Sequence, residues 1–275
     1  MRFDLLQSVS LCGDPATPND DRVGAADALA WVIDGATDLG EAGLVGTRGG
    51  AAWIAQEANA ALAAAGDGSL AAICKGLVAR IARRFEAQRT RLPLGPWELP
   101  CASFLAARAS MDGLDFAWAG DCTALVRRGG VIERVGPRAA DHKDAEIAHA
   151  ASLAEHGLAL KQRPPAIIES LRAARSRPGR HVLGVDPTDA PALSVARVPC
   201  APGDDVLLMT DGFAALIDGY GAYDDAALMA ALASGGLAAL AAELRAIETG
   251  DAECARYPRF KPSDDASAIW LRLAA

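Results

Sequence analysis

Short apolar runs that end at turn residues predict two strands near the start of the chain. Residues 3–12 are rich in apolar side chains and stop at a Gly-Asp-Pro sequence, and residues 27–34 stop at an Asp-Gly pair. Runs of this length between turn residues are typical of β-strands. Apolar positions at helical spacing then predict one helix over 44–65 and a second from the capping residue Ser69 to about Arg91.

The middle of the chain is expected to form strands in close succession. They are predicted at residues 101–110, 114–120, 122–128 and 131–135. The dipeptides Asp112-Gly113 and Gly129-Gly130 are typical of hairpin turns, so we expect these strands to be antiparallel.

The C-terminal half mixes helices with short strands. Helices are expected at 142–157, 164–176, 213–218, 224–234 and 236–249, and strands near 181–183, 193–198, 204–210 and 266–273. Strands come in runs and helices in pairs, which differs from the alternation of a doubly wound sheet. The pattern favours an α+β fold with antiparallel sheets and helices packed outside them. No linker or internal repeat interrupts the chain, so we expect residues 1–275 to form a single domain.

Composition restricts the function classes. The chain has 275 residues, of which 51% are hydrophobic, and a formal net charge of −8. This acidic balance argues against non-specific nucleic-acid binding. No run reaches the roughly 18 apolar residues that span a bilayer, and the N-terminus lacks the apolar stretch of a signal peptide. We therefore expect no membrane association and a cytoplasmic location. The six cysteines contain no C-x-x-C pair and are expected to be reduced.

Candidate chemistry lies in acidic clusters beside strand-like runs. They are Asn19-Asp20-Asp21-Arg22, Val32-Ile33-Asp34-Gly35, Leu207-Leu208-Met209-Thr210-Asp211-Gly212 and Ser263-Asp264-Asp265-Ala266. Strand ends bring distant carboxylates together, and close carboxylates repel each other unless a cation lies between them. Mg²⁺ and Mn²⁺ prefer such oxygen ligands. No zinc pattern competes, because His142, His149 and His156 recur every seven residues and are expected on a solvated helix face. The clusters predict a hard-metal site and a reaction on phosphate.

The order of these clusters resembles that of the metal-dependent protein phosphatases, the type 2C serine/threonine phosphatases. The first cluster is similar to that family's Asn-Glu-Asp-Arg element, the second to Val-x-Asp-Gly, the third to Leu-Leu-x-Ser/Thr-Asp-Gly and the fourth to Asp-Asn-x-Ser/Thr-x-Ile. Between them, Cys101-Ala102-Ser103, Ala119-Gly120-Asp121-Cys122-Thr123 and Asp141-His142 resemble the family's Gly-Ser/Thr-Thr, Gly-Asp-Ser-Arg and Asp-His elements. The resemblance covers nearly the whole chain, in order.

This resemblance implies an αββα sandwich, with two antiparallel sheets face to face and helix pairs outside. It also implies two Mg²⁺ or Mn²⁺ ions in a cleft at one edge of the sheets. Carried over by position, Asp34 bridges the two metals and Gly35 offers its carbonyl oxygen. Asp211 and Asp264 complete the protein ligands of the first metal.

The remaining acidic positions of the family's site match three further residues. Asp20 and Asp21 are expected to hold metal-bound waters, and Asp121 to help bind a third, weaker metal. A hydroxide that bridges two metals would attack the phosphoryl group in line, with Asp34 and Asp211 as the central catalytic carboxylates. The implied activity is hydrolysis of phosphoserine and phosphothreonine in a phosphorylated protein partner.

The chain departs from the family pattern where substrate is held. An arginine that grips the phosphate is replaced by Ala16, and a histidine that some members place after the Asp-Gly pair is replaced by Ala36. Candidate replacements for the arginine are Arg22, Arg48 and Arg138. Two alternatives follow from these departures: a phosphatase-like regulatory or binding module with weak or no turnover, and a phosphatase of small phosphorylated metabolites.

Overall fold

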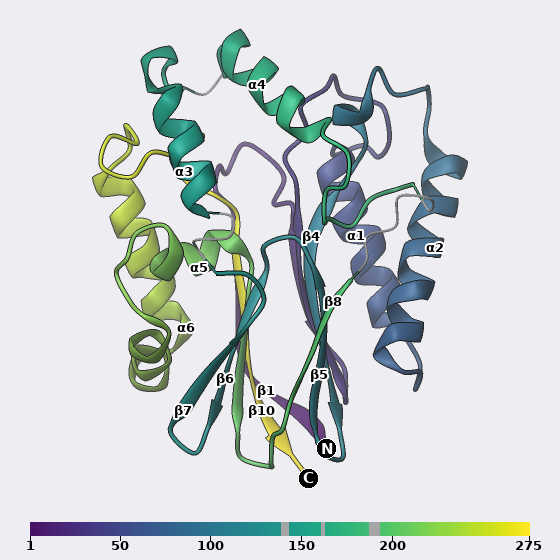
Figure 1. Ribbon diagram of the computed structural model, residues 1–275, viewed down its shortest axis with the longest axis vertical. Coiled ribbons are helices and arrows are strands. Elements are labelled where there is room, and N and C mark those ends of the chain that lie inside the picture. The colour runs from purple at the N-terminus through teal and green to yellow at the C-terminus, as the bar shows by residue number, and fades with distance from the viewer. Residues whose placement is uncertain (139–142, 161–162, 187–192) are drawn as a thin grey trace.

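Two antiparallel five-stranded sheets lie face to face in this computed structural model, which describes the chain except residues 139–142, 161–162 and 187–192 (Figure 1). The first sheet has the order β1 (Arg2–Leu11), β10 (Ala266–Ala274), β9 (Asp205–Met209), β6 (Thr123–Arg128) and β7 (Val131–Val135). The second has the order β2 (Asp21–Ala25), β3 (Leu29–Gly35), β4 (Ala102–Ser110), β5 (Gly113–Ala119) and β8 (Ser194–Val198).

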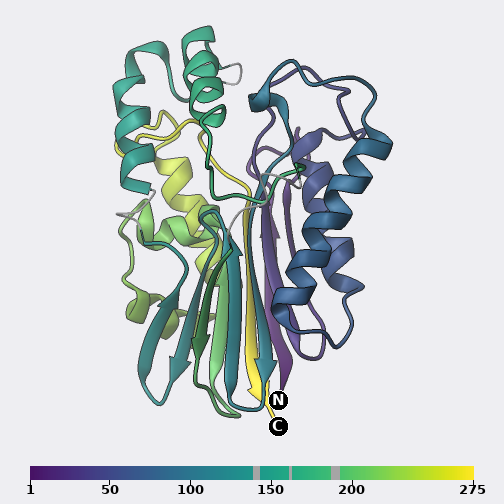
Figure 2. The same ribbon diagram turned by 45° about the vertical axis from the view of Figure 1, so that its right-hand side comes forward.

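Helices cover both outer faces and one end of the sandwich (Figures 1 and 2). Helices α1 (Gly50–Ala63) and α2 (Leu70–Gln88) lie on the second sheet, and α5 (Asp211–Asp218) and α6 (Asp225–Gly250) lie on the first. Helices α3 (Lys143–Ser152) and α4 (Pro165–Arg175) lie together beyond the end of the sheets (Figure 1). Single 3₁₀ turns form at Pro96–Glu98 and Ala154–His156.

Strand β3 shows why the central strands are almost continuously apolar. Leu29, Trp31 and Ile33 point to the layer under α1 and α2, whereas Ala30 and Val32 point to the layer between the sheets. Successive side chains of a strand alternate between its two faces, and here both faces are buried. Strand β9 repeats this alternation between the inter-sheet core and the layer under α5 and α6. The first polar residues after these buried strands therefore come at the strand ends.

Helix α6 is long and apolar enough to resemble a membrane span, with a mean hydropathy of 1.7 over its best window. It is broken at Gly236, which has φ 75° and ψ 177°, and the amide of the next residue donates a hydrogen bond of 2.6 Å to Gln7 Oε1. Leu228, Leu232 and Leu240 are buried in the layer between this helix and the first sheet. Core helices of globular domains have the same composition, so α6 is weak evidence for a membrane span.

Most predicted elements are confirmed, with corrections at their borders. Strand β2 was not predicted, and the helix expected from residue 44 begins only at Gly50, after a loop in which Gly43, Gly46 and Gly49 adopt positive φ. The strands expected in succession do form antiparallel hairpins, β4 with β5 and β6 with β7, but these hairpins belong to different sheets. The strand expected near 181–183 is reduced to a single bridge between Leu183 and Ala102. The two helices predicted on either side of residue 235 form one element with a kink.

The solvated helix face predicted for the histidines is wrong for His149, whereas His156 is exposed but lies in the 3₁₀ turn after α3. His142 lies outside the described residues. The ring of His149 packs edge-on against Phe260 at 5.3 Å between centroids, and its Nε2 lies 2.7 Å from Ser170 Oγ. It therefore helps to join α3, α4 and the loop before β10. All six cysteines are free thiols, as expected.

Candidate metal centre

Strand pairing brings the acidic clusters together at the end of the sandwich below α3 and α4. In the register of β2 and β3, Asp21 lies directly opposite Asp34. Asp211 follows β9 and begins α5, and Asp264 precedes β10, which pairs with β9. A side chain at Gly212 would collide with the backbone carbonyl of Asp265, so glycine is needed for α5 to start this close to the loop that carries Asp264. Clusters more than 200 residues apart in the sequence thus meet.

Two carboxyl groups of the second sheet are held in an environment that disfavours their charge. Asp21 is 1% exposed; its Oδ2 accepts a hydrogen bond of 2.8 Å from Thr210 Oγ1, and its Oδ1 has no partner in the described part of the chain. Burial, and then the neighbouring acids Asp264 and Asp265, raise the pKa of Asp21 well above its ordinary value. Burial, followed by repulsion from Asp21 and Asp211, likewise raises the pKa of Asp34. Such groups are ready to lose a proton when a cation approaches.

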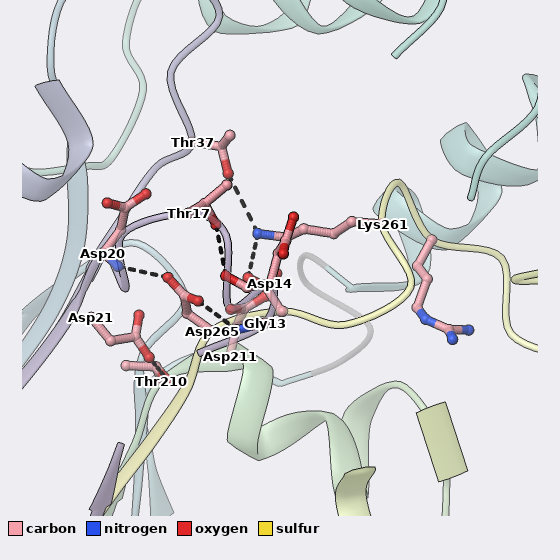
Figure 3. Close-up of polar contacts among 12 residues, drawn as sticks. Gly13, Asp14, Thr17, Asp20, Asp21, Thr37, Thr210, Asp211, Lys261 and Asp265 are labelled. Atoms are coloured by element: carbon pink, nitrogen blue, oxygen red, sulfur yellow. Dashed lines mark hydrogen bonds and ion pairs between the residues drawn. The ribbon is translucent and has the colours of Figure 1, made fainter. Parts of the chain in front are cut away.

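Two lysines neutralise the other carboxylates. Lys143 Nζ lies 3.1 Å from Asp211 Oδ2 and 2.9 Å from Glu146 Oε2. Burial acts to raise the pKa of Asp211, but the Lys143 ammonium and a hydrogen bond with Asp34 outweigh it and hold that pKa below the ordinary range. Lys261 forms an ion pair with Asp264 and a hydrogen bond of 3.4 Å to Thr37 Oγ1 (Figure 3). The positive charges that neutralise these carboxylates therefore come from α3 and from the loop before β10.

Asp265 organises the backbone around the site, a role that the sequence analysis did not assign to it. Its Oδ1 accepts a hydrogen bond of 2.8 Å from the amide of Gly13, and its Oδ2 accepts one of 2.6 Å from the amide of Asp20 (Figure 3). The carbonyl oxygen of Asp20 in turn accepts the amide of Gly35 at 3.2 Å. These bonds join the loop before β10 to the end of β3. The sequence feature that could have indicated this role of Asp265 is its place directly after Asp264, in the same acidic cluster.

A cavity of about 450 Å³ lies between these carboxylates and the helices above them. Five of the seven metal-ligand candidates line it: Asp34, Gly35, Asp121, Asp211 and Asp264. Asp20 and Asp21 are not among its lining residues. Burial, followed by repulsion from Asp211, raises the pKa of Asp121 to about 6, although a hydrogen bond from Ser103 opposes the shift. The structure thus separates an inner set of carboxylates, around the cavity, from Asp20 and Asp21.

The positive side chains of the cavity are not those proposed from the sequence. Arg22 is engaged elsewhere: its guanidinium donates hydrogen bonds to the backbone oxygens of Asn19 and Asp21 and to Gln56. Arg48 and Arg138 are exposed and do not line the cavity. The cationic residues that do line it come from α3, α4 and the loops beside them, and they are Lys143, Arg163, Arg175, Arg180, Arg256, Arg259 and Lys261. Ala16 is exposed and Ala36 lines the cavity without a polar group.

These residues suit a divalent cation. Within the residues that the structure describes, no three carboxylate, imidazole or thiol groups converge closely enough to hold a metal ion as they stand. Lys143 and Lys261 form ion pairs with Asp211 and Asp264 instead. The orphaned Oδ1 of Asp21 and the hydrogen bond between Asp34 and Asp211 mark where positive charge is lacking. The candidate ligands that line the cavity, Asp34, Gly35, Asp121, Asp211 and Asp264, all offer oxygen atoms, which fits Mg²⁺ or Mn²⁺.

The protein phosphatase 2C family model matches residues 14–245. The chain belongs to this family. The match covers most of the chain and confirms the resemblance drawn from the acidic clusters. It includes four of the five candidate ligands around the cavity, whereas Asp264 lies beyond its end. No curated protein sequence matches the chain significantly.

Solved structures with the same fold are phosphatases. The serine/threonine phosphatase PstP/Ppp of Mycobacterium tuberculosis is 19% identical over 100% of both chains, with a TM-score of 0.61. The catalytic domain of PstP in complex with two manganese ions is 18% identical, covering 100% of this chain and 98% of that one, with a TM-score of 0.55. The photosystem II phosphatase PBCP is 14% identical over 99% of each chain, with a TM-score of 0.58. At such identities the likeness shows the fold, and it confirms the predicted αββα sandwich.

Proposed function

We propose that this protein phosphatase 2C chain uses Mg²⁺ or Mn²⁺ to hydrolyse phosphoserine and phosphothreonine esters in proteins. The observation that carries the proposal is that Asp34, Asp121, Asp211 and Asp264 line one cavity in a chain of this family. The manganese ions in the related PstP structure support the choice of metal. Two such ions, and a weaker third one beside Asp121, are part of the proposal.

Each carboxylate has a role that follows from its place in the fold. Asp34, at the end of β3, and Asp211, at the start of α5, lie within hydrogen-bonding distance of each other and would both hold the metal. A bound divalent cation lowers the pKa of water and stabilises charge on the phosphoryl oxygens. Asp264 and the carbonyl of Gly35 are placed to complete its ligands. Lys143 and Lys261 neutralise Asp211 and Asp264, and both lysines would have to give up these ion pairs for the carboxylates to hold a metal.

The remaining residues position these ligands. Asp265 holds the amides of Gly13 and Asp20 and so fixes the loops on either side of the site. Thr210 donates to Asp21 and also accepts the amide of Ser267 at 2.9 Å, which ties β9 to β10 just below Asp211. Supporting contacts of this kind orient metal ligands and affect affinity strongly.

The test is a metal-dependent phosphatase assay with a site variant. The purified protein should hydrolyse p-nitrophenyl phosphate with Mn²⁺ and stop when EDTA is added, and Asp211→Asn should reduce turnover by at least about a hundredfold. Activity that survives in Asp211→Asn would refute the assignment of the site. Exposed Asp67→Asn is a matched control and should behave as the wild type.

Two further measurements, a comparison of substrates and a metal titration, separate the alternatives. Faster turnover of small phosphorylated metabolites than of a phosphopeptide panel would indicate a metabolite phosphatase. Calorimetric Mn²⁺ binding without hydrolysis of any phosphoester would indicate a regulatory module. A cytoplasmic location and a phosphoprotein partner remain part of the proposal, and both rest on the sequence and the family.

A further inference from the structure

The structure leaves one requirement of a phosphatase to be met, which is a cationic group that holds the substrate phosphoryl group. Position 16 carries alanine, and Arg22, Arg48 and Arg138 do not line the cavity. A phosphoryl group carries negative charge on several oxygens, and guanidinium groups bind it through paired hydrogen bonds. The remaining cationic side chains that do line the cavity are therefore the candidates.

Most charged groups around the cavity already have partners. Lys143 contacts Asp211 and Glu146, Lys261 contacts Asp264, and Arg259 contacts Asp251 at 2.6 Å. Arg180 donates to the backbone oxygen of Arg175 at 3.3 Å and lies 3.5 Å from Cys101 Sγ. Glu248, another acid of the cavity, is paired with Arg245. Arg256 is exposed and its guanidinium stacks on the ring of Tyr257, 4.9 Å from the centroid.

Arg163 differs from these residues. It lies just before α4, is half-buried and lines the cavity, and in the described part of the chain it makes no hydrogen bond or ion pair. Burial lowers the pKa of Arg163; the nearby carboxylate of Asp264 opposes this shift, and the positive charge of Arg175 adds to it. The positive charge of Arg163 also acts to lower the pKa of Lys261, which shows that the two cations lie near each other. Three cations are thus held near one another at the edge of the carboxylate cluster, which is an arrangement that an anion would stabilise.

Arg175 supports this arrangement from the end of α4. One of its terminal nitrogens donates a hydrogen bond of 2.7 Å to the backbone oxygen of Thr37, two residues after Gly35. Lys261 reaches the side chain of the same threonine at 3.4 Å. The loop that follows Asp34 is therefore held against α4 and the loop before β10, and Arg163 lies among the elements so joined. This places a free guanidinium beside the carboxylates that would hold the metals.

We propose that Arg163 binds the phosphoryl group of the substrate, with Arg175 and Lys261 shaping the same anion site, and so replaces the arginine that is absent at position 16. The inference rests on the proposed phosphatase function. The phosphoryl group would lie between the metal-facing carboxylates and α4, held from the side opposite to the sheets. Inorganic phosphate, the product of the reaction, should bind to the same place.

The test compares Arg163→Gln, Arg163→Lys and the control Arg177→Gln, which removes the same charge from an exposed residue just beyond α4. Binding of inorganic phosphate is measured by calorimetry at saturating Mn²⁺, and KM and kcat are measured for p-nitrophenyl phosphate. Loss of a hydrogen-bonded charge should weaken phosphate binding and raise KM about ten- to a hundredfold in Arg163→Gln. Arg163→Lys should recover part of this loss, and Mn²⁺ affinity and Arg177→Gln should match the wild type.

Equal phosphate affinity and KM in Arg163→Gln and the wild type would overturn the inference. An equal loss in Arg163→Gln and Arg177→Gln would also overturn it, because it would show a long-range effect of net charge. If the wild type binds phosphate through Arg163 but hydrolyses no ester, the anion site stands and the proposed function fails. Unchanged Mn²⁺ affinity and an unchanged circular dichroism spectrum show that Arg163→Gln is folded.

Discussion

Removing the ammonium of Lys143 should strengthen metal binding. Lys143 Nζ lies 3.1 Å from Asp211 Oδ2, and the two side chains are 20% and 17% exposed. A metal that uses Asp211 must displace this ammonium. At an effective dielectric constant of 20, the Coulomb attraction across 3.1 Å is ~5 kcal/mol. Desolvation offsets much of it, and the net value of a hydrogen bond between charged groups is about 1.5–3 kcal/mol.

The predicted effect of Lys143→Met is therefore a large fall in the dissociation constant for Mn²⁺. A gain of about 1.5–3 kcal/mol corresponds to roughly ten- to a hundredfold tighter binding. Isothermal titration calorimetry of the metal-free protein measures it directly. Lys143→Arg keeps the positive charge beside Asp211 and should bind Mn²⁺ about as the wild type does. Lys75→Met makes the same change in net charge at an exposed position of α2 and should leave the affinity unchanged.

Two results would refute this reasoning. If Lys143→Met binds Mn²⁺ no more tightly than the wild type, the ammonium does not compete with the metal for Asp211. If Lys75→Met tightens binding to the same extent, the effect comes from net charge and not from the ion pair.

Two further predictions concern stability. Asp205 is 1% exposed, lies at the end of β9 away from Asp211, and forms ion pairs with Arg127 and with Arg272, the latter at 2.7 Å. Asp205→Asn should lower the free energy of unfolding by about 3 kcal/mol in urea titrations and leave Mn²⁺ affinity unchanged. A loss below about 0.5 kcal/mol would show that these two ion pairs contribute little to stability. Burial, then Asp265, raises the pKa of Asp20 to about 7, so the folded protein binds more protons than the unfolded chain between about pH 4 and 7. Without metal, the contribution of Asp20 to stability is therefore lost as pH rises toward 7. Thermal melts in EDTA should show a higher Tm at pH 5.5 than at pH 7.5, and Mn²⁺ should reduce this difference. A Tm that rises with pH in EDTA would contradict a raised pKa of Asp20.

Much of the fold was predictable because its signals are local. The buried strands β3 and β9 have continuous apolar runs that end at Asp34 and Asp211, and Ser69 accepts the amide of Ala72 at 3.3 Å as a helix cap should. Strand β2 was missed because its five residues contain an acid, an arginine and a glycine and are only partly buried on one face. Its conformation comes from pairing with β3, which a local pattern does not record.

The acidic residues of the site were predictable from the sequence, whereas the cationic residues around them were not. Asp34, Asp121, Asp211 and Asp264 stand at recognisable positions in the sequence, and the structure brings them to one cavity. The surrounding cations were not predictable, because Arg163 and Lys261 belong to segments that approach the carboxylates only after α3, α4 and the loop before β10 have packed together.

The sequence by itself determined most of the strands and helices and the positions of the acids, because periodicity and turn residues act between near neighbours. It also determined the family, because the order of the acidic motifs is a property of the chain. Only the tertiary structure decided that β4 and β6, which follow each other closely, join different sheets. It also decided that Lys143 neutralises Asp211 and that Arg163 lines the cavity beside the carboxylates without an ion pair to any residue that the structure describes. Charge interactions depend on distance through space, and that distance is fixed only when the two sheets and their covering helices pack.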